Sequence, residues 1–166
     1  MQYDFLDELE KKIEDILKNS DRVLIAVVGK GGTGKSYFGK HIRKRGLGKF
    51  SKRVIAVIDD GLMKLEFLFF FQRRVKIPRT GVDELRPFIK KMPKRIKIIF
   101  FINATPWERI TEADILLKLS TDENTRRQRL QQRYGNNNYE TLKRILRNGE
   151  ISEYNIKYSC LLEAMV

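Results

Sequence analysis

The sequence has only one cysteine, Cys160, so it can form neither an internal disulfide nor a cluster of metal-binding thiols. This scarcity is typical of a reducing compartment, and we expect a cytoplasmic protein. Long apolar runs are also lacking: the longest, such as 97–104, have the length of a strand and fall short of the ~20 residues of a membrane-spanning helix. The acidic, amphipathic start, MQYDFLDELEKK, does not have the pattern of a secretory signal peptide. We therefore expect no membrane span and no secretory leader.

Acidic residues are few relative to basic ones: 21 Asp and Glu stand against 34 Lys and Arg, which gives a formal net charge of +13. Such an excess favours anionic partners, namely nucleotides, phosphorylated metabolites, nucleic acid or anionic lipid. A lysine-rich surface without such a partner would give the same number. No nucleic-acid-binding motif is present, so binding of nucleic acid has only the charge in its favour.

The 166 residues suit one compact domain, 1–166, in which short apolar runs alternate with segments of helical periodicity. This alternation predicts parallel β-α units, that is, an α/β fold of three layers with a mainly parallel sheet and helices on both faces. The segment 62–74 fits a buried helix or a strand equally well. Strands are expected at 22–28, 53–58, 95–102 and 113–119, and helices at 4–19, 36–45, 80–92, 124–132 and 139–147.

One specific motif stands between an expected strand and an expected helix: VVGKGGTGKS at 27–36 contains the pattern G-x-x-x-x-G-K-[ST] in full. Glycines allow successive backbone N–H groups to turn inward around an anion, and the following helix directs its N-terminus at the same place. The motif predicts a phosphate-binding loop for ATP or another nucleoside triphosphate, in which Lys35 reaches the β- and γ-phosphates and Ser36 binds Mg²⁺. The expected nucleotide-binding residues are Gly29, Lys30, Gly31, Gly32, Thr33, Gly34, Lys35, Ser36 and Tyr37.

The stretch KGGTGKS at 30–36 resembles the deviant Walker A motif of ParA/MinD-type ATPases, and KRVIAVIDD at 52–60 resembles their second strand. This resemblance implies a homodimer in which Lys30 reaches the nucleotide of the partner subunit. An ordinary position of a phosphate-binding loop is the alternative for Lys30. The sequence departs from that group at FINATP, where Asn103 stands in place of an aspartate.

A second resemblance, to the small-molecule P-loop kinases of the nucleoside, nucleotide and dephospho-coenzyme A kinase group, covers most of 22–147. It is carried by VIDD at the end of the second strand, by ADILLKL at 113–119 and by TRRQRLQQRYG, similar to a lid. The resemblance implies the P-loop NTPase fold and an arginine-bearing lid within 121–147. It also implies an acceptor-binding insertion within 62–93, where Arg73, Arg74, Lys76 and Arg79 lie, and the segment 1–20 is then an added N-terminal helix.

The chemistry of phosphoryl transfer requires positioning and charge neutralisation. Arg126, Arg129 and Arg133 lie three and four residues apart, so a helix would place them on one face, where they could bind phosphate oxygens. A solvated basic face is the alternative. Asp59 and Asp60 follow a buried strand, and we expect one of them to accept the acceptor's proton, or Asp59 to hold Mg²⁺ with Ser36; an ordinary turn is the alternative.

The resulting expectation is a kinase, a transferase that moves the γ-phosphoryl group of ATP to an anionic or nucleoside-like small molecule with Mg²⁺. A ParA/MinD-like dimerising ATPase is the main alternative. A protein that binds nucleotide without catalysis is a further one, because Asn103 replaces the carboxylate that many kinases carry there.

Overall fold

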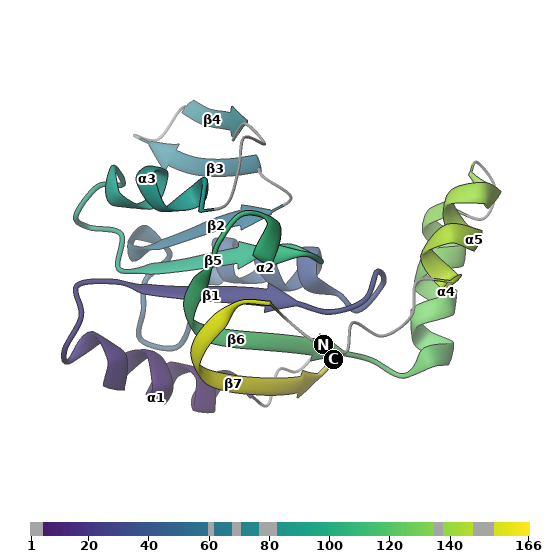
Figure 1. The fold of residues 1–166 in the computed structure, drawn as a ribbon, viewed down its shortest axis with the longest axis horizontal. Helices are drawn as coiled ribbons and strands as arrows, with labels where there is room; N and C mark the ends of the chain where they lie inside the picture. Colours follow the sequence, from purple (N-terminus) through teal and green to yellow (C-terminus); the bar gives the residue numbers. More distant parts are fainter. Residues whose placement is uncertain (1–4, 60–61, 68–70, 77–82, 135–137, 148–154) are drawn as a thin grey trace.

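The computed structural model describes residues 5–59, 62–67, 71–76, 83–134, 138–147 and 155–166, and in 62–67 and 71–76 it describes the backbone alone (Figure 1). The expected base Asp60 and the basic residue Arg79 lie outside the described residues, and the side chains of Arg73, Arg74 and Lys76 are likewise not described.

Seven strands of the described chain form one sheet in the order β4-β3-β2-β5-β1-β6-β7. The five strands from β2 to β7 in this order run parallel to their neighbours, whereas β3 and β4 form an antiparallel hairpin attached to β2. The strands are β1 (Val23–Val28), β2 (Ile55–Asp59), β3 (Leu62–Phe67), β4 (Phe71–Lys76), β5 (Ile98–Ile102), β6 (Glu112–Ser120) and β7 (Lys157–Met165).

Helices cover both faces of the sheet, which gives three layers (Figure 1). α1 (Leu6–Leu17) and α2 (Lys35–Arg45) pack on one face, and α3 (Leu85–Lys90) packs on the other. The short 3₁₀ helices η1 (Lys52–Val54) and η2 (Pro106–Glu108) lie in connections, and α4 (Glu123–Tyr134) and α5 (Tyr139–Arg147) stand at the edge where the parallel strands end. The expected three-layer α/β fold is confirmed.

The strands are continuously apolar because both of their faces are buried. In β1, Val23, Ile25 and Val27 face the cluster that contains α1 and α2, while Ala26 and Val28 face the cluster that contains α3. This two-sided burial removes the alternation of polar and apolar residues, and it explains why the central strands could be recognised as short apolar runs.

The structure differs from expectation in three elements. The ambiguous segment 62–74 forms the hairpin strands β3 and β4, and β7 is a parallel strand that the sequence did not predict. The helix expected at 80–92 is only the six residues of α3. Pro87 lies in the first turn of this short helix, where its missing N–H has no partner to lose, whereas a helix from 80 would have Pro87 in its interior.

Asp83 adds a second reason for the late start of α3, because its φ of 67° is left-handed and interrupts a right-handed helix at that point. Among the described helices, none is long and apolar enough to cross a membrane.

Candidate phosphate-binding site

The loop from Gly29 to Gly34 leaves β1 at the carboxyl edge of the sheet, between the ends of β5 and β6. In an open α/β sheet this is the switch point at which ligands bind. Gly29 has a φ of 141°, and a Cβ built there would lie 2.2 Å from the carbonyl oxygen of Leu119, so only glycine fits. The loop conformation therefore depends directly on the glycine at the first position of the motif.

Lys35 folds back over the loop. Its Nζ donates hydrogen bonds to the carbonyl oxygens of Gly29, at 2.5 Å, and Lys30, at 2.9 Å. The Oγ1 of Thr33 donates to the same Lys30 oxygen at 2.9 Å. These bonds occupy loop carbonyls, and α2 begins at Lys35 after the left-handed residue Gly34, so the positive end of its helix dipole lies at the loop.

The first hydroxyl of α2 meets a carboxylate from the neighbouring part of the sheet. The Oγ of Ser36 donates to Oδ1 of Asp59, the last residue of β2, at 3.4 Å. The two residues expected to hold Mg²⁺ are thus brought together. A hydroxyl and a carboxylate oxygen are hard ligands of the kind that Mg²⁺ prefers, so this donor pair fits the ion.

Asn103, which follows β5, does not extend toward that pair. Its backbone N–H donates to the carbonyl of Val27 at 3.2 Å, which holds the residue against the end of β1. Its side-chain Oδ1 accepts a hydrogen bond from the N–H of Thr105 at 3.1 Å. The side chain therefore closes a turn within its own connection.

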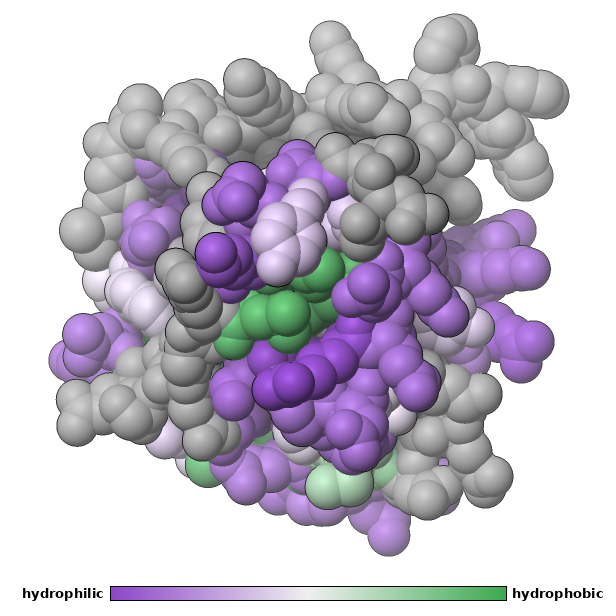
Figure 2. All heavy atoms as spheres, turned by 90° about the vertical axis from the view of Figure 1, so that its right-hand side faces the viewer, coloured by the Kyte–Doolittle hydropathy of each residue, from purple (hydrophilic) through white to green (hydrophobic). Residues whose placement is uncertain are grey.

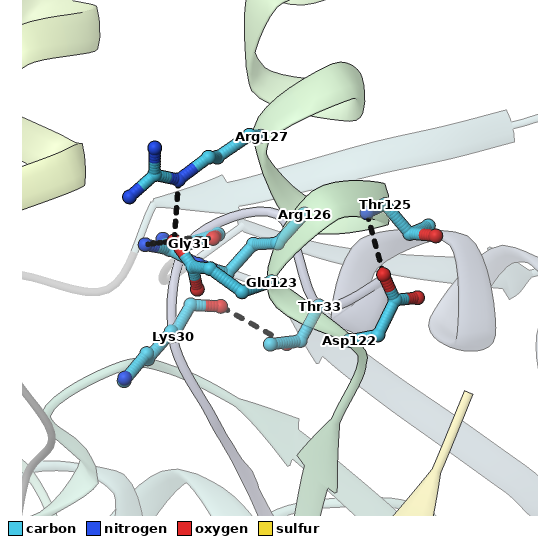
Figure 3. Close-up of polar contacts among 8 residues, drawn as sticks. All are labelled: Lys30, Gly31, Thr33, Asp122, Glu123, Thr125, Arg126 and Arg127. Atoms are coloured by element: carbon cyan, nitrogen blue, oxygen red, sulfur yellow. Dashed lines mark hydrogen bonds and ion pairs between the residues drawn. The ribbon is translucent and has the colours of Figure 1, made fainter.

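Arg126 of α4 reaches the phosphate-binding loop, as Figure 3 shows. Its Nη1 donates to the carbonyl of Gly31 at 3.2 Å, and its Nε and Nη2 donate to the carboxylate of Glu123 at 2.7 and 2.9 Å. Only 4% of the Arg126 side chain is exposed. The residue that the sequence placed among the phosphate-binding arginines thus joins α4 to the loop.

Glu123 also accepts a hydrogen bond from Nε of Arg127 at 3.1 Å (Figure 3). The hydrogen bonds from Arg126 and then from Arg127 lower the pKa of this carboxyl to about 2. The carboxylate is consequently ionised at neutral pH and compensates the charge of the buried guanidinium.

Arg129 and Arg133 take different positions. The Nη1 of Arg129 is buried without a hydrogen-bond partner among the described residues, and it lies 3.6 Å from the place of a Cβ on Gly34. Arg133 is exposed, with its guanidinium 5.2 Å from the centre of the Tyr134 ring. Of the three arginines expected on one face, Arg126 and Arg129 therefore lie at the loop and Arg133 lies on the surface.

The loop glycines have a second role that the sequence did not reveal. A Cβ on Gly31 would lie 2.7 Å from Cγ2 of Ile145 in α5, and one on Gly32 would lie 3.0 Å from Cγ of Leu130 in α4. Both distances are too short for an unstrained contact, so the absence of side chains at Gly31 and Gly32 lets the two helices approach the loop.

Two further expected residues flank this arrangement. Lys30 is half-buried, and Figure 3 shows its amine directed away from Arg126 and Glu123. Tyr37 is 58% exposed on α2. Figure 2 looks onto this edge of the sheet: hydrophilic residues cover most of its coloured surface, around a small apolar area.

A groove of about 540 Å³ lies at the opposite edge, where β1, β6 and β7 begin, and α3 forms one of its walls. Arg22, Leu24, Asp114 and Tyr158 are among the residues that line it. Because these residues are separated in the sequence and belong to no motif, the groove could not be predicted.

No family model matches this sequence, and neither a curated protein nor a solved structure matches it. The fold and the geometry of the loop are therefore the observations on which a functional assignment rests.

Proposed function

We propose that the protein binds a nucleoside triphosphate, ATP first, at residues 29–36 and transfers its γ-phosphoryl group to a small anionic or nucleoside-like acceptor. The observation that carries this proposal is the glycine loop at the switch point of the sheet, with Lys35 folded over it and α2 beginning behind it. A loop of this composition exposes backbone N–H groups to an anion, and the helix dipole adds to the attraction.

Lys35 supplies the first full charge. Its amine is bound to two loop carbonyls, of Gly29 and Lys30, so it is already held at the loop before any phosphate arrives. A phosphate oxygen is a stronger partner for an ammonium than a neutral carbonyl is, because both partners are then charged. Rearrangement of Lys35 from the carbonyls to the phosphates is therefore favourable.

Arg129 supplies the second charge. Its buried Nη1 has no hydrogen-bond partner in the described part of the chain, a state that costs about 1–3 kcal/mol. A phosphate oxygen beside Gly34 would remove that cost and would be neutralised in return. Phosphoryl transfer depends mainly on such neutralisation and on positioning. Arg126 keeps its bonds to Glu123 and Gly31 and acts by holding α4 in place.

The antiparallel hairpin continues the sheet directly from the end of β2, where Asp59 pairs with Leu62. It begins beside the candidate phosphate site, and its sequence carries the basic residues Arg73, Arg74 and Lys76. This placement supports an acceptor site for an anionic molecule along the hairpin.

One observation favours a second candidate, nucleotide binding without transfer. The side chain of Asn103 is engaged with the N–H of Thr105, so the position where many kinases carry a carboxylate supports a turn here. A protein of this kind would bind ATP and release it unchanged.

Calorimetric titration with ATP and Mg²⁺ tests the binding, and incubation with γ-labelled ATP and a panel of nucleosides, nucleotides and coenzyme A precursors tests the transfer. Lys35→Ala is expected to weaken ATP binding roughly tenfold or more, equal to about 1.4 kcal/mol. Lys40→Ala, which removes an exposed lysine from the same helix, is the matched control. Equal affinity of both variants would refute the binding site, and unchanged ATP with every acceptor would favour the second candidate.

A further inference from the structure

A magnesium ion bound to a nucleotide takes few ligands from the protein. It prefers octahedral oxygen coordination and usually has one or two carboxylates, the phosphates and water molecules around it. In a phosphate-binding loop the hydroxyl after the lysine is one protein ligand, which in this chain is Ser36. The carboxylate that completes the site must therefore lie beside the Ser36 hydroxyl.

Asp59 has this position. Its Oδ1 accepts the hydrogen bond from Ser36 at 3.4 Å, and the parallel register places Asp59 next to Ile102 of β5. Asp59 and Asn103 thus stand at the ends of adjacent strands. Both are close enough to the loop to be considered, and their hydrogen bonds distinguish them.

Asn103 uses its only side-chain acceptor atom for the N–H of Thr105. Its remaining side-chain group is an amide NH₂, which donates hydrogen bonds and does not bind a cation. The strand nearest to β1 therefore ends in a residue that is committed to its own turn, and the strand beyond it provides an anionic oxygen at the Ser36 hydroxyl.

We infer that Asp59, at the end of β2, is the magnesium carboxylate of this site and replaces the acid that is missing at the end of β5. The inference rests on the proposed nucleotide binding. A carboxylate that coordinates Mg²⁺ has a lowered affinity for protons, so Asp59 is not the base that accepts the acceptor's proton. The inference thereby selects one of the two roles that the sequence left open for Asp59.

The test is calorimetric titration of the full chain with ATP, once in Mg²⁺ and once in EDTA. For the wild type we expect ATP to bind in both buffers and more tightly in Mg²⁺. Asp59→Asn, which keeps the size of the side chain, should lose the gain due to Mg²⁺, by at least the roughly 10- to 100-fold that the loss of an outer-shell partner of a metal ligand costs. Its affinity for ATP in EDTA should stay within about twofold of the wild type.

Ser36→Ala is a second variant on the other side of the same contact and should lose the Mg²⁺ gain as well. Asn103→Ala is the matched control at the adjacent strand end and should keep it. Retention of the gain in Asp59→Asn, with ATP still bound, would overturn the inference and leave nucleotide binding intact. A wild type that takes up no ATP in either buffer would overturn the proposed function and this inference together.

Discussion

The carboxylate of Glu123 holds two guanidinium groups, and one of them, on Arg126, is almost completely removed from solvent. Removal of one partner from such a pair leaves an uncompensated buried charge. Glu123 itself is 48% exposed, so water screens part of the interaction and the pair is worth less than a fully buried one.

Glu123→Gln is expected to lower the free energy of unfolding by about 1 kcal/mol at pH 7. The neutral amide can still accept a hydrogen bond from Arg126, but it no longer compensates the charge. Urea denaturation measures the difference. Glu108→Gln, which removes an exposed carboxylate from η2, is the control and should change the free energy of unfolding by less than about 0.5 kcal/mol.

The pH dependence has a definite sign. The pKa of Glu123 falls from 4.5 to about 2 on folding, so its stabilisation is fully present above the unfolded value and is lost as the pH falls toward 2. The difference in free energy between the wild type and Glu123→Gln should be constant from pH 7 to about pH 5 and then shrink. A difference that stays constant down to pH 2 would contradict the role given to this ion pair.

At the scale of single residues, the motif predicted which side chains gather and not how they are paired. Lys35, Ser36 and Asp59 meet at the loop as expected, because a loop between a strand and a helix fixes their relative positions over a short distance. The pairing of Arg126 with Gly31 could not be predicted, because it joins residues 95 positions apart and depends on how α4 packs.

Among the elements, α3 is fixed to the sheet by one side chain from the start of β1. The guanidinium of Arg22 donates to the carbonyl of Ile89 in α3 and also to those of Met92, Pro93 and Ile96 in the connection to β5. A planar group with five donors in a fixed fork satisfies several carbonyls at once, and it favours the C-terminal end of a helix.

Arg22→Lys is expected to lower the free energy of unfolding by about 1–2 kcal/mol, because an ammonium has three donors and leaves carbonyls of this group without partners. Urea denaturation is the measurement. Arg53→Lys makes the same exchange at an exposed position and should have an effect of less than about 0.5 kcal/mol. Equal small effects of both variants would show that the carbonyls are satisfied without the guanidinium.

The elements that the sequence predicted correctly are those whose burial is extreme. β1 and β5 are buried on both faces and were recognised by their apolar residues alone. β7 was missed because only Leu162 and Ala164 are buried in it, and its segment LLEAM consists of residues that favour helices. Pairing with β6 decides its conformation, and such a long-range contact has no local signal.

For the molecule as a whole, the open question of oligomeric state depends on the second lysine of the loop. In a dimerising ATPase of the kind that the motif also resembles, Lys30 would act on the partner's nucleotide. Here Arg129 of α4 already brings a guanidinium to the loop within the same chain, next to Gly34. The proposed chemistry therefore has its charges within one subunit, and it does not require a second copy.

We accordingly expect the same molar mass with and without a non-hydrolysable ATP analogue and Mg²⁺, measured by light scattering behind a sizing column. Lys30→Ala should leave both this mass and the affinity for the analogue within about twofold of the wild type, because its amine points away from Arg126 and Glu123. Lys35→Ala, which weakens binding of the analogue, shows whether any change in mass depends on nucleotide. A mass that doubles with the analogue, and does so in neither lysine variant, would support the dimerising switch and reject the kinase in its present form. A mass that doubles equally in all samples would indicate a dimer independent of nucleotide, in which Lys30 has no part.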